Sequence, residues 1–267
     1  MEIFYQILGY IGALLIGLVL GLIGGGGSIL TVPVLVYLLA IEPVVATAYS
    51  LFIVGSTSLV GAVKNIRKNL VDFRTALVFA VPAFIAVYST RKFLVPAIPE
   101  ELFTVGTFTL TKDVAIMIFF AIIMLLASVS MIRGRKDKGN GEPEEVSYNY
   151  PLIILEGAVV GVLTGIVGAG GGFLIIPALV LLAKLPMKKA VATSLLIIAI
   201  KSLIGFIGDV ENLEIQWEFL LTFTAISIVG IFIGIWLNKF IPGEKLKKGF
   251  GWFVLIMGIY IIIKELI

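Results

Sequence analysis

The sequence predicts an all-α polytopic membrane protein built from two inverted-topology repeats. Three observations lead to this fold class: a strongly apolar composition, two glycine clusters that interrupt apolar segments, and an internal similarity between the two halves. Of the 267 residues, 60% are hydrophobic and only 14% are charged, whereas a soluble chain carries roughly a quarter charged residues. A chain of this composition cannot bury its apolar side chains in one core and belongs in a lipid bilayer.

The residue types that are missing exclude most enzyme chemistry. The chain contains neither cysteine nor histidine, which removes disulfides, thiol nucleophiles, imidazole bases and the common zinc and haem ligands. A membrane-embedded enzyme would need paired carboxylates within its spans, where the acids are Glu156, Asp209 and a few residues at the borders. We therefore expect no catalytic residue, no metal and no cofactor. In a membrane protein the net charge of +3 does not indicate nucleic-acid binding; the distribution of the basic residues among the loops indicates the topology.

The first half contains four apolar runs long enough to cross a bilayer, at 3–23, 44–63, 73–95 and 113–132. No basic residue precedes the first run, so we interpret it as a retained membrane helix and not as a signal peptide. Gly24 to Gly27 separate it from a shorter apolar stretch, Ser28 to Ala40. As a helix this stretch would be about 20 Å long, against about 30 Å for the hydrocarbon core.

The second half repeats this plan. It has apolar runs at 152–167, 188–208, 217–238 and 248–263, with a glycine cluster and a short apolar stretch to Ala183 after the first of them. Shifted by 144 residues without gaps, positions 17–64 match 161–208 at 18 of 48 places, including six glycine pairs and Pro33 with Pro177. This indicates an internal duplication. The polar segment 133–151 predicts a cytoplasmic linker between a first membrane repeat, 1–132, and a second, 152–267.

The basic residues predict the topology. If each glycine-broken unit begins and ends on one side, the loops around 64–74, 133–138, 184–189 and 239–248 share a face that holds 15 of the 20 Lys and Arg residues. The opposite face then keeps Arg91, Lys92, Lys112 and Lys264. The positive-inside rule favours this arrangement, which inverts one half relative to the other and leaves both termini outside the cytoplasm. Each unit is either two tilted spans or a re-entrant hairpin, which gives five or three crossings per half.

The two glycine clusters form the predicted binding site. Non-helical backbone at membrane depth persists only where it is buried in protein or lines a wet cavity. Where a helix begins after each cluster, at Ser28 and Phe173, the first N–H groups lack partners and lie at the positive end of the helix dipole. Such a site suits an anion. We predict that one anion is held near the midplane by Gly24, Gly25, Gly26, Gly27 and Ser28 from one half and by Gly168, Gly170, Gly171 and Gly172 from the other.

Other glycines have a simpler explanation. Gly17 and Gly21, like Gly161 and Gly165, have the small-xxx-small spacing that lets two membrane helices pack closely. We predict that these four serve helix packing.

Hydroxyls and one lysine complete the predicted site. Ser50, Thr193 and Ser194 lie early in the spans that follow the clusters, and Ser50 matches Ser194 under the shift. A hydroxyl donates to an oxyanion without adding charge, although bonding to its own helix carbonyl is an equally good explanation. Lys201 is the only basic residue well inside a span, where a cation is costly. The sequence leaves four roles open for Lys201. Its ammonium contacts the anion or carries a coupling proton; alternatively, the side chain extends to the membrane surface or forms an ion pair with Glu156 or Asp209.

Four motifs resemble the TauE/SafE family, the sulfite exporter or TSUP group of anion permeases. They are GLIGGGGSILTVP (21–33), GIVGAGGGFLIIP (165–177), AVATS (190–194) and NLVDF (69–73). The resemblance covers essentially the whole chain. It implies a multi-pass transporter of the inner cell membrane for small inorganic or organosulfur anions, such as sulfite, thiosulfate or organosulfonates. The connection 96–113 is longer than the family pattern. The second half keeps a small-residue helix with Gly230 and Gly234, whereas the matching helix of the first half has Pro82, Ala86 and Tyr88.

We therefore expect a secondary transporter, a permease or exporter, whose anion site opens alternately to each side. An anion channel that uses the same glycine breaks is the main alternative, and a membrane-embedded enzyme or an assembly subunit fits less well. The expected partners are the anion and membrane lipids, the latter at the basic loops. A coupling ion, either a proton or sodium, and a homodimer remain open.

Overall fold

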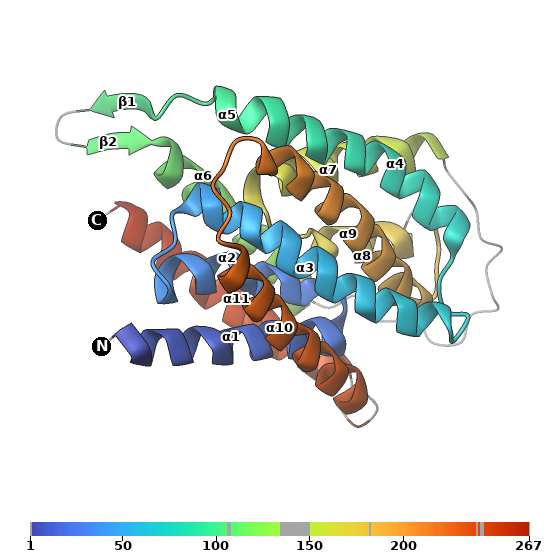
Figure 1. Cartoon of the computed structure of the whole chain (residues 1–267). Coiled ribbons are helices and arrows are strands. Elements are labelled where there is room, and N and C mark those ends of the chain that lie inside the picture. The colour runs from blue at the N-terminus through green and yellow to red at the C-terminus, as the bar shows by residue number, and fades with distance from the viewer. Residues whose placement is uncertain are drawn as a thin grey trace.

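The computed structural model describes residues 2–105, 108–133, 150–181, 183–238, 240 and 243–266. These residues are almost entirely helical (Figure 1), with one two-stranded sheet. Within the described ranges, six helical segments are long and apolar enough to cross a membrane: Pro43–Ile66, Phe73–Ala97, Lys112–Arg133, Lys188–Val210, Trp217–Leu237 and Lys248–Leu266. The prediction of an all-α polytopic membrane protein is thereby confirmed, and the protein is a multi-pass membrane protein.

The first half begins with α1 (Glu2–Ile23), which ends at the first glycine cluster. Three short helical pieces follow without a long regular helix: η1 (Gly25–Leu30), α2 (Thr31–Pro33) and η2 (Val34–Leu38). Three long segments complete the half: α3 (Pro43–Ile66), then α4 (Phe73–Ser89) with its extensions η3 (Thr90–Leu94) and α5 (Val95–Ala97), and α6 (Lys112–Arg133). Local chemistry fixes their starts, since Pro43 lies in the first turn of α3 and the Asp72 carboxylate accepts the Thr75 N–H at the start of α4.

The second half consists of α7 (Tyr150–Val167), α8 (Gly172–Leu181), α9 (Met187–Val210), α10 (Trp217–Leu237) and α11 (Gly243–Leu266). Within the predicted linker 133–151, residues 134–149 lie outside the described residues. Arg133 belongs to α6, and Tyr150 and Pro151 belong to α7.

A β-hairpin occupies the long connection between α5 and α6. Strand β1 (Glu101–Val105) pairs antiparallel with β2 (Phe108–Thr111), and Thr104 lies opposite Thr109. The sequence predicted a longer connection here but no strand. Figure 1 shows the hairpin at the end of the molecule where both chain termini also lie. That placement agrees with termini on one side of the membrane, and which side this is stays a prediction.

The helices α3 and α9 form the centre of the molecule. They pack antiparallel, because Gly55 lies against Leu203 and Gly61 against Leu195. In the most apolar 18-residue stretch of each of these two helices, 67% of the residues are buried, compared with 28% in the corresponding stretch of α11. The less buried helices expose the apolar side chains that face lipid in a membrane protein.

The four glycines predicted to serve helix packing do so. Gly17 and Gly21 lie against the backbone of α10, and Gly161 and Gly165 lie against α4 and η3. A Cβ on Gly17 would lie 2.9 Å from the Ile231 nitrogen, which is closer than real Cβ atoms approach a neighbour. These glycines bring the two backbones of each helix pair together.

The first glycine-broken unit is a hairpin. Gly27 lies against Leu20, Gly12 against Val34, and Gly9 against Leu39, so the segment after the break runs back along α1. The unit therefore begins and ends at the same end of the molecule, as the topology argument expected. The number of membrane crossings in each half stays a prediction.

Contacts between the halves are reciprocal under the 144-residue shift. Helix α1 packs along α10, and its counterpart α7 packs along α4, the counterpart of α10. Gly24 lies against Val191, and the matching pair Gly168 and Thr47 is also in contact. Two repeats related by a pseudo-twofold axis would have these contacts. Their inverted orientation in the bilayer stays a prediction.

Candidate functional site

The two glycine breaks meet between α3 and α9. A Cβ on Gly25 would lie 2.5 Å from the Gly172 Cα, so the two backbones are in direct contact. The Ser28 hydroxyl shares its one proton between two carbonyl oxygens. Its Oγ lies 2.6 Å from the oxygen of Ala169 and 2.7 Å from that of Gly25. Ser28 and Ala169 correspond under the shift to Gly172 and Gly25. The same contact between the repeats is therefore made twice.

Backbone conformation requires glycine at several of these positions. Gly24, Gly168, Gly170 and Gly171 have φ values between +57° and +76°, the left-handed region that a side chain disfavours. Gly26 and Gly27 belong to η1, the 3₁₀ turn that leads out of the first break. The predicted glycines thus lie in two tight turns that contact each other through Gly25 and Gly172.

The second break leaves backbone donors free. The Leu174 and Ile175 N–H groups donate to the Gly171 carbonyl, and the Gly168 N–H donates to Thr164. Within the described part of the chain, the N–H groups of Gly170, Gly172 and Phe173 have no acceptor. Gly172 and Phe173 are the first residues of α8, so their N–H groups lie at the positive end of its dipole.

Lys201 lies beside this break. It is fully buried, and its Nζ donates to Thr164 Oγ1 at 2.7 Å. A Cβ on Gly171 would lie 3.2 Å from the same Nζ. Among the described residues no carboxylate is within ion-pair distance of Lys201. Lys201 does not extend to the surface, because its ammonium is buried. It also does not pair with Glu156 or Asp209, since it donates its hydrogen bond to the Thr164 hydroxyl. Both of these alternatives are therefore wrong.

Ser50 lies on the face of α3 that contacts the second break. Thr47 and Val54 of this face contact Gly168 and Gly170, and the helical spacing places Ser50 between them. Its hydroxyl is buried and has no hydrogen-bond partner among the described residues. Three further buried hydroxyls of α3 and α9 also lack a partner in the described part of the chain: Thr57, Ser58 and Ser202.

The other two predicted hydroxyls are engaged. Ser194 Oγ donates to the Val191 carbonyl at 2.8 Å, so this serine bonds its own helix. Thr193 Oγ1 accepts the Asp72 N–H at 3.0 Å, which joins the start of α9 to the loop before α4. The structure thus gives Thr193 a partner away from the glycine breaks.

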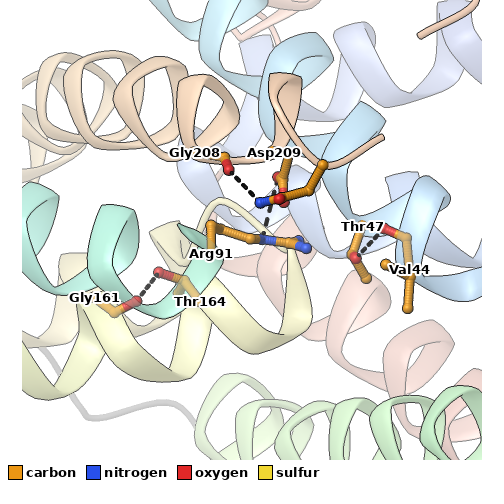
Figure 2. A network of polar contacts seen from close by, with 8 residues as sticks. Val44, Thr47, Arg91, Gly161, Thr164, Gly208 and Asp209 are labelled. Atoms are coloured by element: carbon orange, nitrogen blue, oxygen red, sulfur yellow. Dashed lines mark hydrogen bonds and ion pairs between the residues drawn. The ribbon is translucent and has the colours of Figure 1, made fainter. Parts of the chain in front are cut away.

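One charged pair was not predicted. The topology argument counted Arg91 among the loop bases, but the structure buries it completely in η3, and its Nε lies 3.5 Å from Asp209 Oδ2. Figure 2 shows the guanidinium extending from η3 to the Asp209 carboxylate at the end of α9. The available signal was that Arg91 and Asp209, opposite in charge, end two apolar runs on the same predicted side. Hydropathy alone does not reveal that those two ends pack together.

Comparisons with known proteins identify the family. The family described as "Sulfite exporter TauE/SafE" matches residues 10–261. The chain is 28% identical over 252 residues to a "Probable membrane transporter protein" of Xylella fastidiosa (strain 9a5c), covering 93% of this chain and 91% of the relative. It is 30% identical over 248 residues to "Probable membrane transporter protein YunE" of Bacillus subtilis (strain 168), with 85% and 86% covered. The search of solved structures found no match. The glycine motifs and this match over nearly the whole chain agree, and the protein belongs to the TauE/SafE sulfite exporter family of membrane transporters.

Proposed function

We propose that this transporter is a secondary carrier of small sulfur-containing anions such as sulfite, thiosulfate or organosulfonates. We further propose that it binds the anion where the two glycine breaks meet, with access alternating between the two sides. The observation that carries this proposal is the buried ammonium of Lys201, which lies beside Gly171 and donates a hydrogen bond to the Thr164 hydroxyl. A buried cation without a carboxylate partner is costly, and an anionic ligand offsets that cost.

The second break, which Lys201 contacts at Gly171, offers further donors. The free N–H groups of Gly172 and Phe173 begin α8, and the hydroxyl of Ser50 lies on the neighbouring face of α3. Charge-assisted hydrogen bonds from an ammonium and from helix N-terminal amides suit the oxygens of a sulfur oxyanion. The absence of a side chain on Gly170 and Gly171 lets such a ligand approach the backbone. The description of the family as sulfite exporters supports the same chemical class.

The contact between the breaks supports alternating access. The Gly25–Gly172 contact and the Ser28 hydrogen bond close the centre of the molecule in this conformation. An anion can pass only if the two halves move apart at this contact, which is a two-state motion of one repeat against the other. A channel through the same breaks is the alternative, and it would need both sides open at once.

A ligand panel on the purified protein tests the proposal. Thermal unfolding is measured with sulfite, thiosulfate and methanesulfonate, and with acetate and chloride as comparison anions. Binding to the folded state raises the midpoint in proportion to the logarithm of ligand concentration. We expect a rise for the sulfur oxyanions in wild type that is lost in Lys201→Met. Equal midpoints with and without all three sulfur anions would contradict the proposal.

A further inference from the structure

Arg91 is fully buried, and its guanidinium donors lack hydrogen-bond partners among the described residues. Its Nε lies at ion-pair distance from Asp209, but none of its three guanidinium nitrogens has a hydrogen-bond partner among the described residues. Asp209 Oδ2 also lacks a hydrogen-bond partner in that part of the chain. A buried guanidinium normally satisfies most of its five N–H donors, because leaving them unpaired costs free energy. The pair therefore has the charges of a salt bridge without its hydrogen bonds.

Packing places Arg91 close to the second glycine break. Its neighbour Thr90 lies against Gly165, three residues before Gly168 at the break. On the other side, the Arg91 Cβ lies beside Gly208 of α9. Figure 2 shows the guanidinium pointing away from η3, in a view that also contains Thr47 of α3 and Thr164 of α7. Thr164 is the hydroxyl that accepts from Lys201, and Thr47 contacts Gly168.

Asp209, the ion-pair partner of Arg91, lies on the same helix as Lys201. Asp209 follows Lys201 by eight residues on α9, which corresponds to about 12 Å along the helix axis. The Arg91 end of α4 leads to α5 and the β-hairpin, at the end of the molecule that holds both termini. The guanidinium thus lies between the glycine breaks and that end.

The internal duplication argues against a purely structural role. Under the 144-residue shift, Arg91 corresponds to Ile235 and Asp209 corresponds to Asn65. The matching helices α10 and α3 pack together as α4 and α9 do, without a charge at either position. The fold therefore does not need this ion pair at the equivalent position of the other repeat.

We propose that Arg91 is a second anion-binding station, between the glycine breaks and the end of the molecule that holds the termini. Asp209 occupies its guanidinium until an oxyanion replaces the carboxylate. The planar guanidinium presents two parallel N–H groups, so the ligand class is an oxyanion with at least two terminal oxygens on one atom, such as a sulfur oxyanion or a sulfonate. This inference rests on the proposed function, because it extends the route of the same anion.

The test is calorimetric titration of thiosulfate into the purified, detergent-solubilised protein. Wild type should bind one thiosulfate ion at each of the two stations. Arg91→Lys keeps the charge but loses the planar fork, and the Kd of the second station should rise about tenfold, the equivalent of one charge-assisted hydrogen bond. Asp209→Asn removes the competing carboxylate, and the Kd of the second station should fall. A salt bridge that only holds the fold predicts no such opposite pair of changes.

A neutral double variant, Arg91→Gln with Asp209→Asn, keeps the test decisive if a single variant fails to fold. Removing both charges of a buried pair is far better tolerated than removing one. We expect this protein to unfold at nearly the wild-type temperature without ligand and to keep thiosulfate binding at the glycine breaks, while the Kd of the second station rises at least tenfold. The control is Lys92→Met with Glu211→Gln, which removes the adjacent, more exposed ion pair and should leave the Kd unchanged.

Two results would overturn this inference. If the folded double variant binds thiosulfate at both stations with the wild-type Kd values, Arg91 is structural, while the site at the glycine breaks still stands. If wild type binds no sulfur oxyanion at all, the second station and the proposed function both fail.

Discussion

Gly25 and Gly172, one from each repeat, contact each other backbone to backbone at the point where the two breaks meet. The shift that relates the repeats also relates this contact to the hydrogen bond from Ser28 to Ala169. Any motion that opens the centre of the molecule must break both.

Gly172→Ala should reduce anion transport severely. An added Cβ would collide with the backbone of Gly25, which has no flexible side chain that could give way. The repeats would be held apart, so we expect at least a tenfold loss of thiosulfate flux in proteoliposomes. Gly249→Ala is the matched control, because a Cβ at Gly249 meets no atom within 4 Å. Equal flux in the two variants would show that the contact at Gly172 does not matter for transport.

Ser28→Ala should destabilise the closed conformation. It removes the hydroxyl that joins the two breaks, and a buried hydrogen bond of this kind contributes about 1 kcal/mol. We expect a lower unfolding midpoint in the absence of ligand. Ser128→Ala is the control, since the Ser128 hydroxyl is buried but donates only to its own helix, at Leu125. If the two variants unfold at the same temperature, the Ser28 bond between the repeats contributes no more than a bond within a helix.

Lys201→Met should weaken anion binding while keeping the fold. Methionine fills much of the same volume without the charge, so we expect at least a tenfold rise in the thiosulfate Kd. Thr164→Val, which removes the acceptor of Lys201, should change the Kd less, because the ammonium remains beside Gly171. Titration calorimetry on both variants checks the order. A larger effect of Thr164→Val would place the anion on the hydroxyl and not on the lysine.

Gly17→Leu should act on folding and not on affinity. Its side chain would enter the backbone of α10 at Ser227 and Ile231, whereas Lys201 lies on α9. We expect a low yield of folded protein, with an unchanged Kd in the fraction that folds. Gly258→Ala is the milder comparison, because the nearest atoms belong to the flexible side chain of Leu125. A changed Kd in folded Gly17→Leu would show that the α1–α10 contact also shapes the anion site.

Carrier and channel make different predictions for exchange. A carrier with one alternating site should take up labelled thiosulfate faster when unlabelled thiosulfate is present inside the vesicles. A channel should show no such acceleration, since both sides reach the site at once. Counterflow in proteoliposomes distinguishes them, and flux without acceleration would favour the channel.

The repeated features were predictable from the sequence. Two glycine clusters at a fixed offset indicated backbone breaks, and the structure brings Gly25 of one cluster into contact with Gly172 of the other. Lys201 was predicted because it stands alone in an apolar run. These inferences needed only composition, spacing and the internal duplication.

The rest depended on tertiary packing. Arg91 ends an apolar run, and only the packing of η3 against Gly165 and Gly208 determines that it is buried. Thr193 and Ser194 are neighbours in one motif, yet one accepts from a loop amide and the other donates to its own helix. The β-hairpin at 101–111 is too short for the alternation of polar and apolar residues to stand out.

The most direct measurement is diffraction at the selenium absorption edge from crystals soaked with selenite, a heavier analogue of sulfite. We expect an anomalous peak within hydrogen-bond distance of Lys201 Nζ and of the first N–H groups of α8, at Gly172 and Phe173. A strong peak at another place, with this position empty, would contradict the central claim that the two glycine breaks and Lys201 hold the anion.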